Sequence, residues 1–239
     1  MRVSHISINI FMVAMIICIM PFQAAHAQRD RVSRGGAISN LCPEDDPKVV
    51  VKLATSKTKY YKNFDARTIN SIHNAPGGGT ILGLAGGPLE IATRGVFSIL
   101  GDTKGKACVK IKNLEVLLWA KPVVVIASNF PKGSCEYKQV FAHEQQHIRI
   151  TRRFIKEYAP KLREEVKDII STSRHQILTR QDNIEEAQVE LQDPILSRIN
   201  QYFNSVMPVL QSRQAAIDTP EEYAKVAAKC DNWGERLNQ

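Results

Sequence analysis

The chain has 239 residues, five cysteines and a formal net charge of +8, with 32 lysines and arginines against 24 acidic residues. The basic residues are scattered without a run of five like charges, which favours a solvated surface and argues against specific nucleic-acid binding. A weak attraction to an anionic envelope surface is compatible with this charge. Residues 101–107 have Ala107 where a phosphate-binding loop requires serine or threonine, and no serine-nucleophile motif occurs.

The first residues have the pattern of a secretory signal. One arginine precedes an apolar stretch at residues 8–22, and small residues follow up to Ala27. This order predicts a signal peptide at residues 1–27, cleaved after Ala27, and an exported bacterial protein of the periplasm or the extracellular space. An uncleaved anchor at residues 6–22 is the alternative, since this stretch approaches the length of a membrane-spanning helix. Loss of Arg2 with the signal leaves a charge of about +7.

Four cysteines follow the expected signal: Cys42, Cys108, Cys135 and Cys230. An even number in an exported chain favours two disulfides, and the sequence alone allows three pairings. We expect Cys108 with Cys135, which ties a strand to the helix that carries two histidines. We expect Cys42 with Cys230, which ties the two ends of the chain together.

The first half of the mature chain has the composition of a sheet. After an expected linker at residues 28–46, residues 47–130 are rich in β-branched residues and glycine. Residues 109–112 alternate aliphatic side chains with lysine, which predicts a strand with one wet face, and residues 123–126 predict a buried strand. Asp65 is a good N-cap for a short helix.

From Ser134 onward the pattern is almost entirely helical. Four breaks are expected: at Pro160, Asp193–Pro194, Pro208 and Thr219–Pro220. Thr219 is the expected N-cap of the last helix, with proline at its first position. The predicted fold class is α+β, with a small, mainly antiparallel N-terminal sheet, then the histidine helix, then a layer of long helices.

Residues 141–149, FAHEQQHIR, carry two histidines four residues apart with a glutamate after the first. Positions i and i+4 are neighbours on a helix, so His143 and His147 can bind one zinc ion at about 2.0–2.1 Å each. Glu144 points close to such an ion without binding it, which suits a general base for zinc-bound water. The apolar stripe of residues 134–158 passes over Glu144 and His147, so a carboxylate faces inward and requires a partner.

This HExxH pattern resembles the active helix of the zincin metallopeptidases. The chain is also similar to small exported bacterial proteins regarded as zinc-dependent proteases, with SCEY at the start of this helix. The resemblance implies Zn²⁺ held by His143 and His147, with Glu144 as catalytic base. It implies a zincin-like α+β catalytic region at residues 47–160, followed by a helical C-terminal region at residues 161–239.

The third metal ligand is open at this stage. The chain is not similar to metzincins, whose motif would place glycine at Ile150 and histidine at Arg153. A gluzincin-like ligand would be a glutamate further on, where Glu164 and Glu165 are available.

Chain geometry suggests a different third ligand. If the chain reverses at Pro160 into an antiparallel helical hairpin, His175 falls opposite His143 and His147. The alternative is that Pro160 only kinks one long helix and that His175 is a surface residue.

The expected activity is hydrolysis of an amide bond by Glu144-assisted attack of zinc-bound water. The substrate would be a peptide, a protein or the peptide part of the cell wall. An exposed strand within residues 113–128 could bind it by strand addition.

A second hypothesis is a non-enzymatic exported envelope protein with at most a structural metal site. Its helices, at residues 161–192 and 194–207, would form an interaction surface. One apolar stripe there follows helical spacing, at Ile195, Ile199, Tyr202 and Val206. Packing in the core is the commoner explanation of such a stripe.

Overall fold

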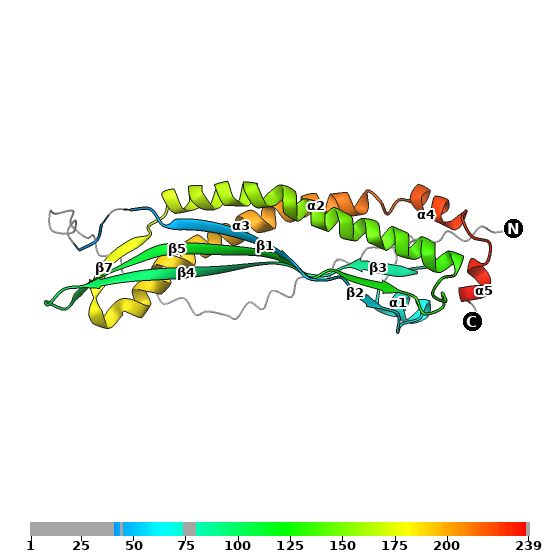
Figure 1. Cartoon of the computed structure of the whole chain (residues 1–239), viewed down its shortest axis with the longest axis horizontal. Coiled ribbons are helices and arrows are strands. Elements are labelled where there is room, and N and C mark those ends of the chain that lie inside the picture. The colour runs from blue at the N-terminus through cyan, green and yellow to red at the C-terminus, as the bar shows by residue number, and fades with distance from the viewer. Residues whose placement is uncertain (1–40, 44, 74–79, 238–239) are drawn as a thin grey trace.

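The computed structural model describes residues 41–43, 45–73 and 80–237, which form an elongated α+β structure (Figure 1). The expected signal peptide at residues 1–27 and most of the linker at residues 28–46 lie outside this part. Within it, no helix is long and apolar enough to cross a bilayer. The predicted fold class is therefore confirmed at the level of α+β.

The larger sheet is built around one long central strand, β5. Its strands are β1 (Lys48–Thr55), β4 (Leu89–Gly101), β5 (Lys106–Ala120) and β7 (Gln176–Arg180). β4 pairs antiparallel with one edge of β5. The other edge pairs with β7 antiparallel at residues 106–110 and with β1 in parallel at residues 113–120. The larger sheet is mainly antiparallel, as expected, with one parallel pairing, and it includes a strand from the region expected to be almost entirely helical.

The smaller sheet contains β2 (Lys59–Tyr61), β3 (Gly83–Gly86) and β6 (Val123–Ile126). β6 is central, parallel to β2 and antiparallel to β3. The prediction of a strand at residues 123–126 is confirmed. The expected exposed strand within residues 113–128 is wrong, because β5 and β6 are both paired along two edges.

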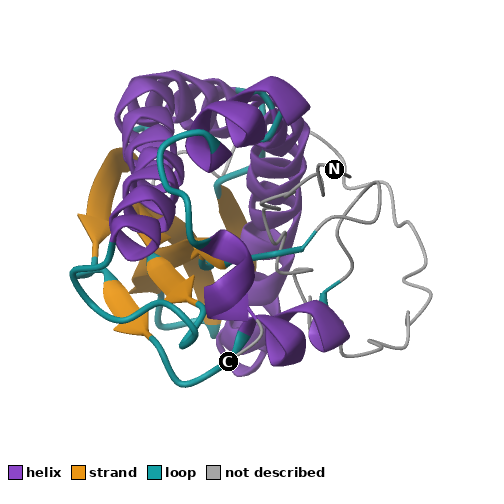
Figure 2. Cartoon of the chain, turned by 90° about the vertical axis from the view of Figure 1, so that its right-hand side faces the viewer, coloured by secondary structure: helices purple, strands orange, loops and turns teal. Residues whose placement is uncertain are grey.

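Helices cover these sheets, as the view along the long axis shows (Figure 2). They are α1 (Ala66–Ile72), α2 (Cys135–Ser171), α3 (Ile184–Ala215), α4 (Pro220–Ala227) and α5 (Trp233–Leu237), with a short 3-10 turn at Gln181–Asn183. Two predicted N-caps are confirmed: the Asp65 carboxylate accepts from Thr68 N, and the Thr219 hydroxyl accepts from Glu222 N.

The prediction of a wet face on the strand at residues 109–112 is wrong at Lys110. Its side chain is only 7% exposed, forms an ion pair with Asp45 and donates to the Pro43 carbonyl oxygen. The segment before β1 covers this position, so the ammonium group finds protein acceptors in place of water.

The break and the hairpin considered at Pro160 are also wrong, and the alternative of one long helix is confirmed, because α2, 37 residues in length, continues through that proline to Ser171. An interior proline costs a helix about 3 kcal/mol. Beyond it, however, Leu162, Val166, Ile169 and Ile170 are all at most 3% exposed. At about 1.5–3 kcal/mol for each buried side chain, their packing outweighs the lost backbone bond.

The same balance explains α3, which continues through Pro194 and Pro208 although breaks were expected there. Its apolar stripe lies in the core: Ile195 and Ile199 are fully buried, and Tyr202 and Val206 pack against them. The core interpretation of this stripe is confirmed. In place of the helix expected at residues 161–192, the structure has the end of α2, then β7 and the start of α3. The helix expected at residues 194–207 lies inside α3.

Two hydrophobic cores lie along the molecule, and α2 packs in both. Val140 and Ile148 belong to the core around the smaller sheet, whereas Phe154 and later residues belong to the core between the larger sheet and α3. The expected boundary between residues 160 and 161 therefore falls inside one helix.

Both expected disulfide pairings are wrong. Cys42 pairs with Cys108, and Cys135 pairs with Cys230. Cys108 lies in the part of β5 that pairs with β7, and β7 follows the C-terminal end of α2 in the chain. Cys135 is the first residue of α2, at the other end of that helix. A helix of 37 residues is about 55 Å long, so Cys108 and Cys135 lie at opposite ends of the molecule.

Peptide mapping without reduction should find the fragments of Cys42 linked to Cys108 and those of Cys135 linked to Cys230. The second bond closes a loop with a sequence separation of 95. On the chain-entropy model, replacing both of its cysteines by serine should lower the free energy of unfolding by about 4–5 kcal/mol in a urea titration. A fragment linking Cys108 to Cys135 in natively exported protein would contradict the fold.

Candidate metal centre

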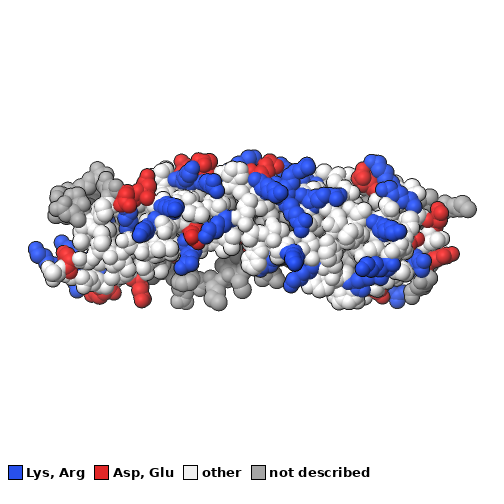
Figure 3. All heavy atoms as spheres, in the orientation of Figure 1, with Lys and Arg blue, Asp and Glu red and all other residues white. Residues whose placement is uncertain are grey.

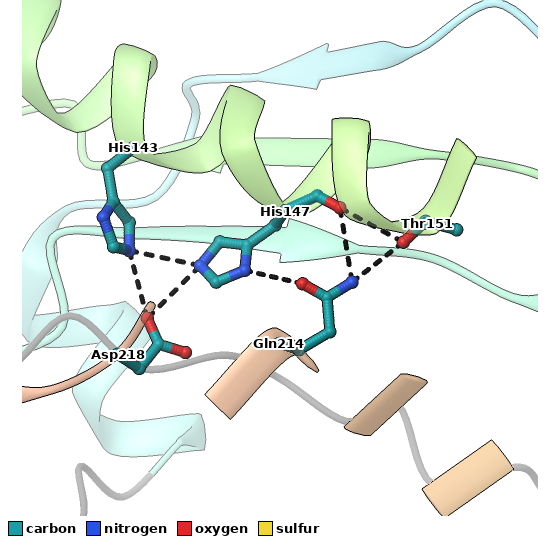
Figure 4. A network of polar contacts seen from close by, with 5 residues as sticks. All are labelled: His143, His147, Thr151, Gln214 and Asp218. Carbon is teal, nitrogen blue, oxygen red and sulfur yellow. Dashed lines mark hydrogen bonds and ion pairs between the residues drawn. The ribbon is translucent and has the colours of Figure 1, made fainter. Parts of the chain in front are cut away.

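Three potential metal ligands meet where α2 contacts the turn between α3 and α4. His143 and His147 are neighbours on one face of α2, and Asp218 stands in the turn, directly before the N-cap Thr219 (Figure 4). The Arg213 guanidinium fixes the end of α3 against α2 by two hydrogen bonds to the Glu157 carboxylate, at 2.7 and 3.0 Å.

The ligand atoms have the spacing of a metal site. His143 Nε2 lies 3.0 Å from Asp218 Oδ1, His147 Nε2 lies 3.2 Å from the same oxygen, and the two nitrogens are 3.1 Å apart. In a tetrahedral site with bonds of about 2.0–2.1 Å, neighbouring ligand atoms are about 3.3 Å apart. The three atoms thus form one nearly equilateral face, which can hold a metal ion.

Gln214 determines that Nε2 of His147 faces this cluster as an acceptor. The Gln214 amide nitrogen donates to the His147 carbonyl oxygen and to the Thr151 hydroxyl, at 3.3 and 2.9 Å. Its amide oxygen is therefore the acceptor for Nδ1–H of His147, at 2.7 Å. With the proton on Nδ1, neutral His147 presents the lone pair of Nε2 to Asp218 and His143.

This arrangement requires a positive charge. Burial raises the pKa of Asp218, but hydrogen bonds and charge from His143 and His147 outweigh it, and the net pKa is lowered. Those hydrogen bonds require a proton on Nε2 of the rings. With the His147 proton on Nδ1, the Asp218 carboxylate instead faces a second acceptor, His147 Nε2, in a place where its side chain is only 8% exposed. Two buried acceptors at this distance repel unless a proton on the ring or a metal ion lies between them.

Glu144 lies beside the cluster and has an unsatisfied polar atom. It is 1% exposed, and its Oε1 has no hydrogen-bond partner among the described residues. Burial raises the pKa of Glu144 well above its ordinary value, and the nearby charge of Asp218 adds to the increase. Such a carboxyl group binds a proton readily, as a general base requires.

β3 approaches Glu144 closely because Gly83 has no side chain. A Cβ atom at Gly83 would lie 2.7 Å from Glu144 Oε1 and 2.6 Å from a methyl group of Val140. The glycine therefore lets the edge of the smaller sheet pack directly on the face of α2 that carries the carboxylate.

Tyr223 brings a further polar group to the site from the first turns of α4. Its hydroxyl is buried without a hydrogen-bond partner in the described part of the chain, and its ring centroid lies 6.0 Å from that of His143. Burial raises the pKa of Tyr223, and the Asp218 and Glu144 carboxylates add to the increase. The hydroxyl thus stays protonated, and it can donate to the Asp218 carboxylate or to another acceptor in the site.

The structure brings together three of the residues that the sequence singled out, His143, Glu144 and His147. His175 is not among them, because α2 continues to Ser171, about 36 Å beyond His147. Instead, His175 Nδ1 contacts the Ser173 carbonyl oxygen, and its backbone carbonyl pairs with Ile111.

The other candidates for a third ligand are also remote. Glu164 is about 26 Å along α2 from His147 and pairs with Lys167. Glu165 is its neighbour on the same helix and equally distant.

Sequence reasoning missed Asp218, Gln214 and Tyr223. The sequence contained a signal for Asp218 and Tyr223, namely the N-cap at Thr219. This cap places Asp218 in the turn before the helix and Tyr223 one turn into it. Nothing in the sequence indicates that this turn folds against α2, because 75 residues separate Asp218 from His143.

Comparisons with family models, with curated proteins and with solved structures give no match to this chain. The site is therefore interpreted from its own geometry.

The ligand set can be tested by metal titration. Asp218→Ala should weaken Zn²⁺ binding at least about a hundredfold, because it removes one of three ligands and the only anion bound to both histidines. His175→Ala, which changes a histidine outside the cluster, is the control and should leave the affinity within about twofold. Competition with a chromogenic chelator measures both. An unchanged affinity for the Asp218 variant would eliminate this site.

Proposed function

We propose that the chain is a zinc-dependent hydrolase of peptide bonds, with His143, His147 and Asp218 as metal ligands and Glu144 as catalytic base. The observation that supports this most is the buried, unpartnered Oε1 of Glu144 beside the three ligand atoms. A carboxylate in that position destabilises the fold by several kcal/mol unless a cation or a proton compensates it.

The residues fit zinc better than a harder cation. Two imidazole nitrogens and one carboxylate oxygen at tetrahedral spacing are a usual zinc donor set, whereas calcium and magnesium prefer oxygen ligands in larger numbers. When bound, zinc supplies Lewis acidity: it polarises a carbonyl group and lowers the pKa of a coordinated water.

The surrounding side chains supply the proton transfer. Glu144 accepts the proton of the attacking water at Oε1 and returns it to the leaving amine. Asp218 and the two histidines hold the ion, and Gln214 keeps His147 in the tautomer that binds it. The Tyr223 hydroxyl donates to the oxygen on which negative charge develops.

The smaller sheet offers a place for the substrate. Among the described residues, β3 pairs with β6 on one side only, and it passes Glu144 at Gly83. An extended peptide that adds to the outer edge of β3 would run past the catalytic base. This supports a peptide, or the peptide part of the cell wall, as the substrate class.

One observation favours a second function, a metal-stabilised envelope protein without activity. His147, His143 and Asp218 are only 0%, 3% and 8% exposed, and structural zinc sites are closed whereas catalytic sites keep an open position. Hydrolysis therefore requires the site to open when substrate binds, with Asp218 and the Tyr223 hydroxyl kept in place.

Glu144→Gln distinguishes the two functions. For a hydrolase, the variant should retain one equivalent of zinc and lose activity on a peptide library by about 10² or more, because the base is gone and the ligands are intact. Glu136→Gln is the matched control, since Glu136 lies on the same helix, is 3% exposed and is not part of the cluster. Equal activity of the two variants would show that Glu144 is not the base.

Tyr223→Phe removes only the hydroxyl and keeps the ring beside His143. We expect kcat to fall by about 10²–10³, as for loss of a donor to a developing oxyanion, with KM and zinc content little changed. Tyr202→Phe in the larger core is the control. A rise in KM at constant kcat would instead assign Tyr223 to substrate binding.

A further inference from the structure

The outer face of α2, opposite the metal cluster, carries a row of cations. Lys138, Arg149, Arg152 and Lys156 follow one another at intervals of eleven, three and four residues, which places them along one side of a helix. All four are exposed, and Arg153 stands exposed beside them. The row extends over about 27 Å.

A segment from the other half of the chain extends this row. The side chains that alternate toward α2 in the segment around β2 are those of Thr58, Tyr60 and Lys62. The Arg152 guanidinium donates to the Thr58 hydroxyl at 3.0 Å, and the Gln145 amide donates to the Tyr60 hydroxyl at 3.1 Å. Lys62 Nζ lies 5.8 Å from the centroid of the Tyr137 ring.

Six cations therefore share one surface, here called the basic face: Lys62, Lys138, Arg149, Arg152, Arg153 and Lys156. None of them forms an ion pair with a described residue, whereas cations such as Lys161 and Arg213 do. Residues 47–64 contain no acidic residue, and the only one in α2 between residues 138 and 156 is the buried Glu144. Figure 3 shows the blue side chains gathered over the middle of α2.

The basic face also has an aromatic component. Tyr60 is 54% exposed and packs against Phe141 on α2, with ring centroids 5.7 Å apart. In the same segment, Tyr61 and Phe64 are 43% and 38% exposed. Tyrosine rings beside lysine and arginine are typical of surfaces that lie at the headgroup level of a bilayer.

We propose that the basic face binds the surface of a bilayer that contains anionic phospholipids. The cations stand exposed along one side of a helix, so they can contact many headgroups of an extended surface at once. Each guanidinium can bind a phosphate with two hydrogen bonds. Because the metal cluster lies on the opposite side of α2, binding in this orientation leaves the proposed active site directed away from the membrane. The proposal does not depend on hydrolysis.

The test is cosedimentation of the full chain with vesicles of phosphatidylglycerol and phosphatidylcholine. The variant carries Arg149→Gln, Arg152→Gln, Arg153→Gln and Lys156→Gln, which keep good helix formers. The control carries Arg94→Gln, Lys104→Gln, Lys106→Gln and Lys112→Gln, four exposed cations of the β4–β5 hairpin without ion pairs in the described structure. Both lose the same net charge.

We expect the basic-face variant to lower the partition coefficient at least tenfold and the hairpin control to lower it less than threefold. Added salt should release the wild-type protein, because screening shortens the reach of its charges. If the quadruple variant does not fold, the pairs Arg149→Gln with Arg153→Gln and Arg152→Gln with Lys156→Gln should each lower the coefficient at least threefold.

Three results would overturn the proposal. Equal losses in the two quadruple variants would mean that only net charge matters. Equal binding to vesicles of phosphatidylcholine alone would assign binding to an apolar segment. Tighter binding to soluble polyphosphate than to the anionic vesicles would identify a linear polyanion as the partner.

Discussion

The burial of one unbroken helix along two hydrophobic cores determines where every functional side chain lies. Packing beyond Pro160 keeps α2 unbroken, and its N-terminal part passes β3 on one side and the α3–α4 turn on the other. A break at that proline would have turned the C-terminal part back over the histidines. Because the helix continues, the chain returns through β7 and α3, and Asp218 completes the cluster.

The cluster shows how electrostatics restricts what the site can be. His147 is fixed as an acceptor by Gln214, Asp218 is anionic, and Glu144 has an oxygen without a partner, all in a place that water barely reaches. Without a bound proton or a cation, such a group of acceptors is unstable in a low-dielectric interior. A metal ion would satisfy these ligand atoms, with Glu144 beside it.

Local patterns predicted local structure well. Asp65 and Thr219 were recognised as N-caps because capping is decided by a few neighbouring residues, and His143, Glu144 and His147 share a face because helical spacing requires it. Proline was overvalued as a break at residues 160, 194 and 208, since its local cost is outweighed by tertiary burial that the sequence does not show. The disulfide pairing, the buried Lys110, the ligand Asp218 and the gathering of scattered cations into one face all depend on contacts between distant segments. Spacing along the chain carries no information about such contacts.

The cross-links of this molecule are distributed along its length. The Cys42–Cys108 disulfide closes one end and the Cys135–Cys230 disulfide the other, while a metal ion at Asp218 would join α2 to a turn 75 residues later in the region between them. A ligand that binds only the folded arrangement stabilises it by about 4 kcal/mol at a thousandfold excess over its Kd. Metal supply would therefore set how firmly the C-terminal helices are held to α2, and chelation would loosen the middle of the molecule while both ends stay covalently closed.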